Sequence, residues 1–141
     1  MRIAARGVLL DTYTIIRWAN GLALRSPGKE AIDAHRGALL ISPISAWEIG
    51  LLSKPERPQP MLFMPDPHTW FARVASETGV RLVELTWEMA VDSSHLPQPI
   101  HGDPADRLLI ATARALDLAL VTSDARILDY GRAGHVTAIA C

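Results

Sequence analysis

Four acidic residues, far apart in the chain, have side chains that could bind one metal centre together. They are Asp11, Glu48, Asp106 and Asp124. Divalent cations such as Mg²⁺ prefer oxygen ligands, which carboxylates supply. A bound ion lowers the pKa of a water molecule, orients that water and stabilises negative charge on a phosphate oxygen. Without an ion, four carboxylates in one pocket would repel one another, and at least one would tend to take up a proton. A metal centre therefore requires a fold that gathers these acids.

The apolar runs of the sequence predict the strands of a parallel sheet, and two of the acids follow such runs. Strands are expected over residues 7–11, 38–42, 80–85, 118–122 and 135–139. The first run shows no apolar–polar alternation, which is typical of a strand covered on both faces. Asp11 ends this strand, and Asp124 follows the fourth strand by two residues. In such sheets ligands bind beyond the carboxyl ends of the strands, where the strand order reverses. We therefore expect both acids at a ligand-binding edge.

Helices are expected between the strands, which makes the fold class α/β. Helical spacing and capping residues predict helices over residues 12–20, 27–36 (capped by Ser26), 43–53, 68–78, 87–95, 104–116 and 125–130. Residues 54–67 contain five prolines and are expected to form a long exposed loop. The alternation of strands and helices predicts a parallel sheet with helices on both faces, a three-layer α/β/α sandwich. With 141 residues, of which 49% are hydrophobic, the chain is expected to form a single domain over residues 1–141.

Helix capping offers a second explanation for two neighbouring acids. Pro104 suits the first helical position, and Asp103 before it suits the N-cap. Asp106 falls three residues after Asp103, as in a capping box, so its carboxylate either caps the helix or binds a metal. Asp103 is better explained as the cap than as a ligand.

The same two explanations apply to Glu48 and Asp124, and less readily to Asp11. Ser45 and Glu48 have capping-box spacing, and Asp124 precedes a short predicted helix that it could cap. Asp11 closes an apolar strand and has no obvious local partner. The joint placement of the acids favours a shared site over four separate structural roles.

Composition and missing motifs exclude several classes of protein. The formal net charge of −1 gives no overall attraction to nucleic acid, although an enzyme can still contact one locally. No run approaches the roughly 18 apolar residues of a membrane span, and residues 1–6 lack the apolar segment of a signal peptide. The single cysteine, Cys141, allows no intrachain disulfide. We therefore expect a cytoplasmic protein. No glycine-rich nucleotide loop occurs, so no nucleotide cofactor is expected.

Other candidate residues are weaker. The histidines lack paired metal-ligand spacing, and His101, the one nearest to the acids, is either a turn residue or a substrate contact. No serine lies in the Gly-x-Ser-x-Gly pattern of a nucleophile elbow. Arg107 and Arg126 each lie beside a candidate acid and either approach a phosphate or form a surface ion pair. The four tryptophans fall on predicted helices, which favours packing over base stacking.

Four segments form a specific combination, although each is weak alone. They are Leu9-Leu10-Asp11-Thr12, Ser42-Pro43-Ile44-Ser45-Ala46-Trp47-Glu48-Ile49, Asp103-Pro104-Ala105-Asp106-Arg107 and Val121-Thr122-Ser123-Asp124. In this order and with these intervals they resemble the PIN-domain family, above all the VapC-type toxins of bacterial toxin–antitoxin pairs. The resemblance covers nearly the whole chain.

The resemblance implies a Rossmann-like PIN fold with about five parallel strands and a Mg²⁺- or Mn²⁺-dependent endoribonuclease. The family's acidic quartet, which is catalytic and binds the metal, carries over to Asp11, Glu48, Asp106 and Asp124. Asp106 is preferred to Asp103 as the third acid because the family's helical acid precedes an apolar run ending in Ala-x-Ala, here residues 111–113. The accessory residues would be Asp103, Thr122, Thr12 and Arg107.

The resemblance also implies partners. Proteins of this type are usually dimers, and a small antitoxin silences them by inserting its tail into the active-site groove, often with an arginine. We therefore expect RNA as substrate, a cognate antitoxin as protein partner, and either a homodimer or a complex with the antitoxin. The proline-rich residues 54–67 depart from the family in a region that varies among its members, and they are expected to influence the choice of RNA or antitoxin.

Two other functions stay open on the sequence alone. The first is a non-catalytic PIN-like module that binds RNA or protein, against which the presence of all four acids counts. The second is a phosphatase-like hydrolase with Asp11 as nucleophile. That chemistry usually needs a second acid two residues later, and Tyr13 occupies that position.

Overall fold

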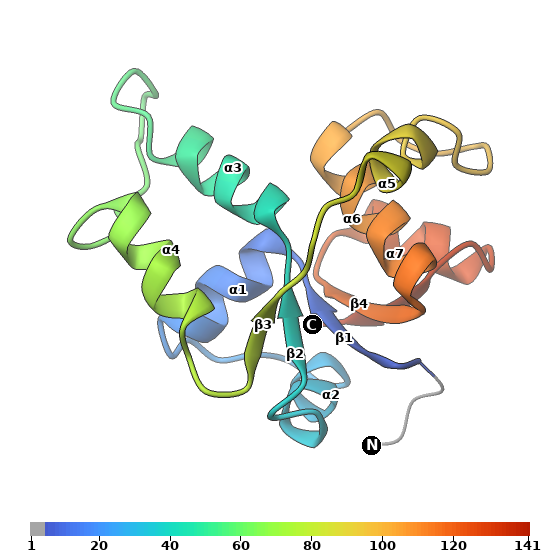
Figure 1. The fold of residues 1–141 in the computed structure, drawn as a ribbon, viewed down its shortest axis with the longest axis horizontal. Coiled ribbons are helices and arrows are strands. Elements are labelled where there is room, and N and C mark those ends of the chain that lie inside the picture. The colour runs from blue at the N-terminus through green and yellow to red at the C-terminus, as the bar shows by residue number, and fades with distance from the viewer. Residues whose placement is uncertain (1–4) are drawn as a thin grey trace.

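A central parallel sheet organises the computed structural model, which describes residues 5–141 (Figure 1). Its strands are β1 (Gly7–Leu10), β2 (Leu39–Ile41), β3 (Val80–Leu82), β4 (Leu118–Thr122) and β5 (Thr137–Ala140). The strand order is β3-β2-β1-β4-β5, and every neighbouring pair is parallel. All five predicted strands are present, but the third ends three residues earlier than predicted and the fifth begins two residues later. The expectation that residues 1–6 form no signal peptide falls largely on residues 1–4, which lie outside the described part of the chain.

Helices cover both faces of the sheet, as the predicted three-layer α/β/α class requires. They are α1 (Thr12–Ala19), α2 (Gly28–Ala34), α3 (Pro43–Leu52), α4 (Pro67–Ala75), α5 (Trp87–Asp92), α6 (Pro104–Leu116) and α7 (Ala125–Arg132). Figure 1 shows α1, α3 and α4 on one side of the sheet and α5, α6 and α7 on the other. Within residues 5–141, no helix has both the length and the apolar character needed to cross a membrane.

Two hydrophobic cores, one on each face, hold the layers together. Along β1, Val8 and Leu10 point into the core that contains Ile15 of α1. Leu9 between them points into the opposite core, with Leu109 of α6. All five side chains are almost fully buried. Because successive strand residues point to opposite faces, a strand covered on both faces must be apolar throughout. This is why the first strand lacks alternation.

The strand order reverses between β1 and β4. The chain proceeds from β1 to β2 and β3 on one side, then crosses back to place β4 and β5 on the other side of β1. At this reversal Leu10 is in register with Val121, and the Asp11 amide donates a hydrogen bond to the Val121 carbonyl over 3.1 Å. Crevices at such points are where open α/β sheets bind ligands. The loops after β1 and β4 carry Asp11 and Asp124 to this edge.

One local prediction was wrong. Ser26 was expected to cap the second helix, but Pro27 occupies the N-cap position and provides no side-chain hydrogen bond. The predicted proline-rich loop is present and mostly exposed, with one exception: Phe63 is buried and packs edge-on against Trp70, with ring centroids 4.9 Å apart. Phe63 fastens the loop to α4, since burial of an aromatic ring outweighs the lack of regular structure around it.

Candidate active site

One pocket at the carboxyl edge of the sheet collects all four predicted acids. Its volume is about 330 Å³. Asp11 lies between β1 and α1, Glu48 on α3, Asp106 in the first turn of α6, and Asp124 between β4 and α7. The complete lining is Asp11, Thr12, Tyr13, Glu48, Asp103, Asp106, Leu109, Ser123, Asp124 and Arg126. Four elements that are distant in the sequence therefore deliver carboxylates to the same cavity.

Asp11 is the N-cap of α1, a role that the sequence did not reveal. Its Oδ1 accepts a hydrogen bond from the Thr14 amide over 2.8 Å, and its Oδ2 accepts one from the Thr122 hydroxyl. The residue is 6% exposed. Burial raises the pKa of Asp11, against the opposing effect of the Thr122 and Thr14 hydrogen bonds, and the charge of Asp124 raises it further. Thr122, predicted as an accessory residue, therefore orients the most buried acid.

Glu48 faces the pocket from the second turn of α3. The helix is capped by Ser42, whose hydroxyl accepts from the Ile44 amide over 3.1 Å, so the alternative of a capping box from Ser45 to Glu48 is wrong. Pro43 begins the helix earlier because its fixed φ suits the first helical position. Glu48 is instead held by the Thr12 hydroxyl, which donates to Glu48 Oε1. Burial raises the pKa of Glu48, and the charges of nearby aspartates add to this effect.

Asp103 and Asp106 divide two roles at the start of α6. Asp103 is the N-cap, as predicted, and its Oδ1 accepts from the Asp106 amide over 3.0 Å. The Asp106 carboxylate does not complete a capping box; its Oδ2 lies 2.8 Å from His101 Nε2. Burial raises the pKa of Asp106 against the hydrogen bond from His101, and the charges of Asp103 and Asp124 also raise it. The Asp106 side chain therefore faces the pocket and is fixed by a histidine.

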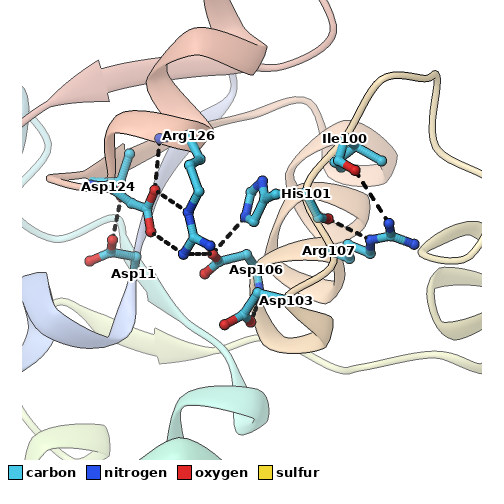
Figure 2. A network of polar contacts seen from close by, with 9 residues as sticks. Asp11, Ile100, His101, Asp103, Asp106, Arg107, Asp124 and Arg126 are labelled. Carbon is cyan, nitrogen blue, oxygen red and sulfur yellow. Dashed lines mark hydrogen bonds and ion pairs between the residues drawn. The ribbon is translucent and has the colours of Figure 1, made fainter.

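Arg126 lies between two of the acids. Its Nη2 is 3.1 Å from Asp124 Oδ2 and 3.6 Å from Asp106 Oδ2, and Figure 2 shows the guanidinium reaching from Asp124 towards Asp106. Asp124 also caps α7 by accepting from the Arg126 amide over 2.8 Å. Burial acts to raise the pKa of Asp124, but its hydrogen bonds and ion pair with Arg126 hold that pKa below its usual range.

Arg107 points away from the carboxylates (Figure 2). Its Nε donates to the His101 carbonyl over 2.8 Å, and its Nη2 donates to the Ile100 carbonyl over 3.4 Å. It is absent from the lining of the acidic pocket. In this structure Arg107 acts on the loop before α6, and through that loop it positions His101 against Asp106.

The donor set of the pocket suits a divalent cation. Carboxylate oxygens are the ligands of Mg²⁺ and Mn²⁺, and the raised pKa values of Asp11, Glu48 and Asp106 mark negative charges that a cation would stabilise. Among residues 5–141, however, no three Asp, Glu, His or Cys side chains are grouped tightly enough to hold one ion. Each acid is turned towards a partner within the protein, and Arg126 lies where two of them would have to approach. The residues fit a metal ion once Arg126 has moved aside.

Several pocket residues were not singled out by the sequence. Tyr13, Leu109 and Ser123 line the cavity. The only sequence signal for each was closeness to a predicted acid. Tyr13 and Ser123 lie within two residues of one, and Leu109 lies about one helical turn after Asp106. His101 was recognised as the nearest histidine, but its contact with Asp106 depends on how the preceding loop turns back. Of the predicted site residues, the pocket brings together the four acids with Thr12 and Asp103, while Thr122 contacts Asp11 from below the surface.

Known proteins share both the sequence family and the fold. The PIN domain family model matches residues 8–133. Ribonuclease VapC22 of Mycobacterium tuberculosis is 34% identical over 134 residues, which cover 92% of this chain and 96% of that protein.

Two solved structures support the fold. A toxin–antitoxin complex from Klebsiella pneumoniae aligns with a TM-score of 0.58 at 21% identity, covering 84% of this chain and 87% of that chain. VapBC2 from Rickettsia felis, bound to a DNA fragment from its promoter, aligns with a TM-score of 0.62 at 15% identity, covering 94% of this chain and 97% of that chain. Because the family model spans most of the sequence and the VapC22 ribonuclease aligns over nearly its full length, the chain belongs to the PIN-domain family and resembles its VapC-type members.

Proposed function

We propose that this protein is an endoribonuclease that uses Mg²⁺ or Mn²⁺ to hydrolyse RNA phosphodiester bonds, and that it is the toxin of a toxin–antitoxin pair. The observation that carries the proposal is the pocket in which Asp11, Glu48, Asp106 and Asp124 line one cavity at the reversal of strand order. The similarity to a VapC ribonuclease supports the reaction, and the toxin–antitoxin complexes among its structural relatives support an antitoxin as partner. One PIN domain over residues 1–141 would carry the activity, with cytoplasmic RNA as its substrate.

Three aspartates would hold the ion. Asp11, Asp106 and Asp124 would bind it directly or through water. Asp11 is already oriented by the Thr122 hydroxyl and Asp106 by His101. Asp124 is oriented by the backbone amide of Arg126, which donates to its Oδ1. When bound, such an ion would polarise the phosphate that is cleaved and stabilise negative charge on the leaving oxygen. Orientation by neighbouring groups matters because ligands held in place lose less freedom on binding.

Glu48 would act on the attacking water. Glu48 lines the pocket, and its Oε1 accepts a hydrogen bond from Thr12, so Oε2 is the oxygen that would orient the water and accept its proton. The raised pKa of Glu48, caused first by burial, makes it a stronger base than an exposed glutamate. Asp103 would remain a helix cap at the edge of the pocket, adding negative charge without being a required ligand.

Cleavage of total cellular RNA, with Mg²⁺, with Mn²⁺ and with a chelator, tests the proposal. We expect new RNA ends only with the metal, and a loss of about 100-fold or more in Asp11→Asn, because a metal ligand matters at least as much as its supporting neighbours. Asp92→Asn on the exposed surface of α5 is the matched control and should cleave normally. Full activity of Asp11→Asn in the presence of metal would contradict the assignment. RNA binding without cleavage under every metal condition would favour the non-catalytic module.

A further inference from the structure

A basic pocket lies beside the acidic one. Its volume is about 230 Å³, and it is lined by Thr14, Arg17, Ala23, Arg25, Ser123 and Cys141. These residues come from α1, from the connection between α1 and α2, and from the segments that directly follow β4 and β5. The pocket therefore opens at the same carboxyl edge of the sheet as the carboxylates, but its lining contains two guanidinium groups and no acidic side chain.

The positive charge of this pocket has no carboxylate partner in the described part of the chain. Neither Arg17 nor Arg25 lies within 4.0 Å of an acidic oxygen among residues 5–141, whereas Arg36, Arg126 and Arg132 each form an ion pair. Arg17 is nevertheless held in place, because its Nη2 donates to the Ala23 carbonyl over 2.7 Å.

The other lining groups suit an anion. Ser123 is an exposed residue of the lining, and its hydroxyl can donate a hydrogen bond. Burial raises the pKa of the Cys141 thiol, so this group adds no negative charge near neutral pH. A cavity of this size is below the usual range for a whole small-molecule ligand and matches a compact group such as a phosphate.

Two residues connect the basic pocket to the acidic one. Ser123 lines both cavities. Thr14 lines the basic pocket, while its backbone amide donates to Asp11 Oδ1 over 2.8 Å. A chain that places one anionic group among the carboxylates can therefore place a neighbouring group against Arg17 and Arg25.

We propose that this basic pocket binds a phosphate of the RNA strand adjacent to the phosphate that is cleaved. The inference rests on the proposed function and names a binding site for its substrate. The carboxylates repel an RNA backbone, so affinity must come from cationic groups nearby, and phosphate contacts by Arg and Lys supply most non-specific affinity for nucleic acid. Arginine suits this task because its planar fork can donate two parallel hydrogen bonds to phosphate oxygens.

Binding of a fluorescent single-stranded oligoribonucleotide, measured by anisotropy over a series of salt concentrations with Ca²⁺ in place of Mg²⁺, tests the subsite. The variants are Arg17→Gln and Arg25→Gln, with Arg25→Lys to keep the charge. Arg81→Gln is the matched control, because Arg81 is exposed on β3, the outer strand of the sheet that lies farthest from β5. We expect each Gln variant to bind RNA about 3–10-fold more weakly, with a salt slope reduced by about 0.7 for one lost phosphate contact. Arg25→Lys should retain the slope, Arg81→Gln should match the unmodified protein, and Mn²⁺ affinity should be unchanged in all four.

Unchanged affinity and salt slope in both Gln variants would overturn the subsite. Arg17 also supports the chain near Ala23, so Arg17→Gln could lower the stability of the protein. If Arg17→Gln melts at a lower temperature, the result for Arg25→Gln alone decides the test. RNA binding that is unchanged while the antitoxin binds more weakly would assign the pocket to peptide carboxylates and would equally overturn the inference. Failure of the proposed nuclease function is recognised separately, since it appears as no metal-dependent cleavage by the unmodified protein.

Discussion

The Asp11 carboxylate is a buried charge that the proposed metal site needs, and we expect the metal-free fold to be more stable without this charge. Its pKa is raised in the folded protein, chiefly by burial, so the folded state binds this proton more tightly than the unfolded chain does. Stability therefore falls as the pH rises from the unfolded pKa near 4 through the folded value. An asparagine keeps an oxygen for the Thr14 amide and carries no charge.

We expect Asp11→Asn to raise the melting temperature of the metal-free protein at neutral pH by about 2–4 °C. The difference should shrink towards pH 4, where the wild-type carboxyl is itself becoming protonated in the folded state. Asp124→Asn is the informative control because the pKa of Asp124 is lowered, through its contacts with Arg126, so loss of that charge should lower stability at neutral pH. A melting temperature that falls in both variants would show that the hydrogen bonds of Asp11 outweigh its desolvation.

Arg126 is predicted to compete with the metal ion. Its guanidinium contacts both Asp124 and Asp106, and an ion between these acids must displace it. Its side chain is 57% exposed, so it has solvent to move into and its ion pairs are weak ones. We expect Arg126→Ala to lower the dissociation constant for Mn²⁺ by about 3–10-fold, which corresponds to about 1 kcal/mol, measured by titration calorimetry or electron paramagnetic resonance. Arg132→Ala, on the same helix and paired with Asp129, should leave that constant unchanged. Weaker Mn²⁺ binding in Arg126→Ala would contradict the competition.

At the scale of elements, the start of α6 links helix capping to the site. Asp103 Oδ1 accepts from the Asp106 amide, so the cap also fixes the backbone that carries a proposed ligand. We expect Asp103→Ala to cost about 1 kcal/mol of stability, as the loss of a helix N-cap does. Asp103→Asn should keep the cap, the stability and RNA cleavage within a few-fold of wild type. Thermal melting and cleavage rates of the two variants separate the roles.

The Asp103→Asn variant decides whether Asp103 is also a metal ligand. If Asp103→Asn loses Mn²⁺ affinity as severely as Asp106→Asn does, then Asp103 is a ligand as well as a cap. Retained affinity in Asp103→Asn, together with a loss in Asp106→Asn, would support the assignment of the third ligand to Asp106.

The elements were largely predictable because their signals are local. Apolar runs marked the strands, and Asp103-Pro104 marked the start of α6. The predicted start of α3 at Pro43 is confirmed, and because Pro43 favours the first helical position, the alternative capping box from Ser45 to Glu48 does not form. Local signals failed where distant contacts decide the structure. Phe63 is buried in a proline-rich loop because Trp70, on the following helix, offers a ring to pack against.

The acidic residues that line the pocket could be predicted from the sequence, but most of their contacts could not. Asp11, which follows an apolar strand, was expected at the carboxyl edge, and the reversal of strand order puts it there. Its hydrogen bond from Thr122 spans 111 positions of sequence, and spacing alone gives no signal for such a pair. The basic pocket was missed for the same reason: Arg17, Arg25 and Ser123 come together only through the α1–α2 connection and the neighbouring β4.

At the scale of the whole molecule, metal binding should stabilise the fold. The four acids belong to segments that span residues 11–124, so the pocket exists only when the sheet and the helices after β1, β2 and β4 are assembled. An ion that binds the folded protein and not the unfolded chain adds RT ln(1 + [L]/Kd), about 2.7 kcal/mol at 100 times Kd. It would also neutralise the raised-pKa carboxylates that oppose folding at neutral pH.

We therefore expect the melting temperature to rise by several degrees with increasing Mn²⁺ or Mg²⁺ and to return to its starting value when a chelator is added. Asp106→Asn should flatten this dependence, because it removes a proposed ligand while leaving the Asp103 cap in place. Asp92→Asn, at an exposed position of α5, should show the full wild-type rise. Differential scanning calorimetry over a series of metal concentrations gives the measurement. A melting temperature that is indifferent to metal at concentrations where RNA is cleaved would mean that the ion arrives with the substrate, held jointly by its phosphate and by carboxylates that cannot retain it alone.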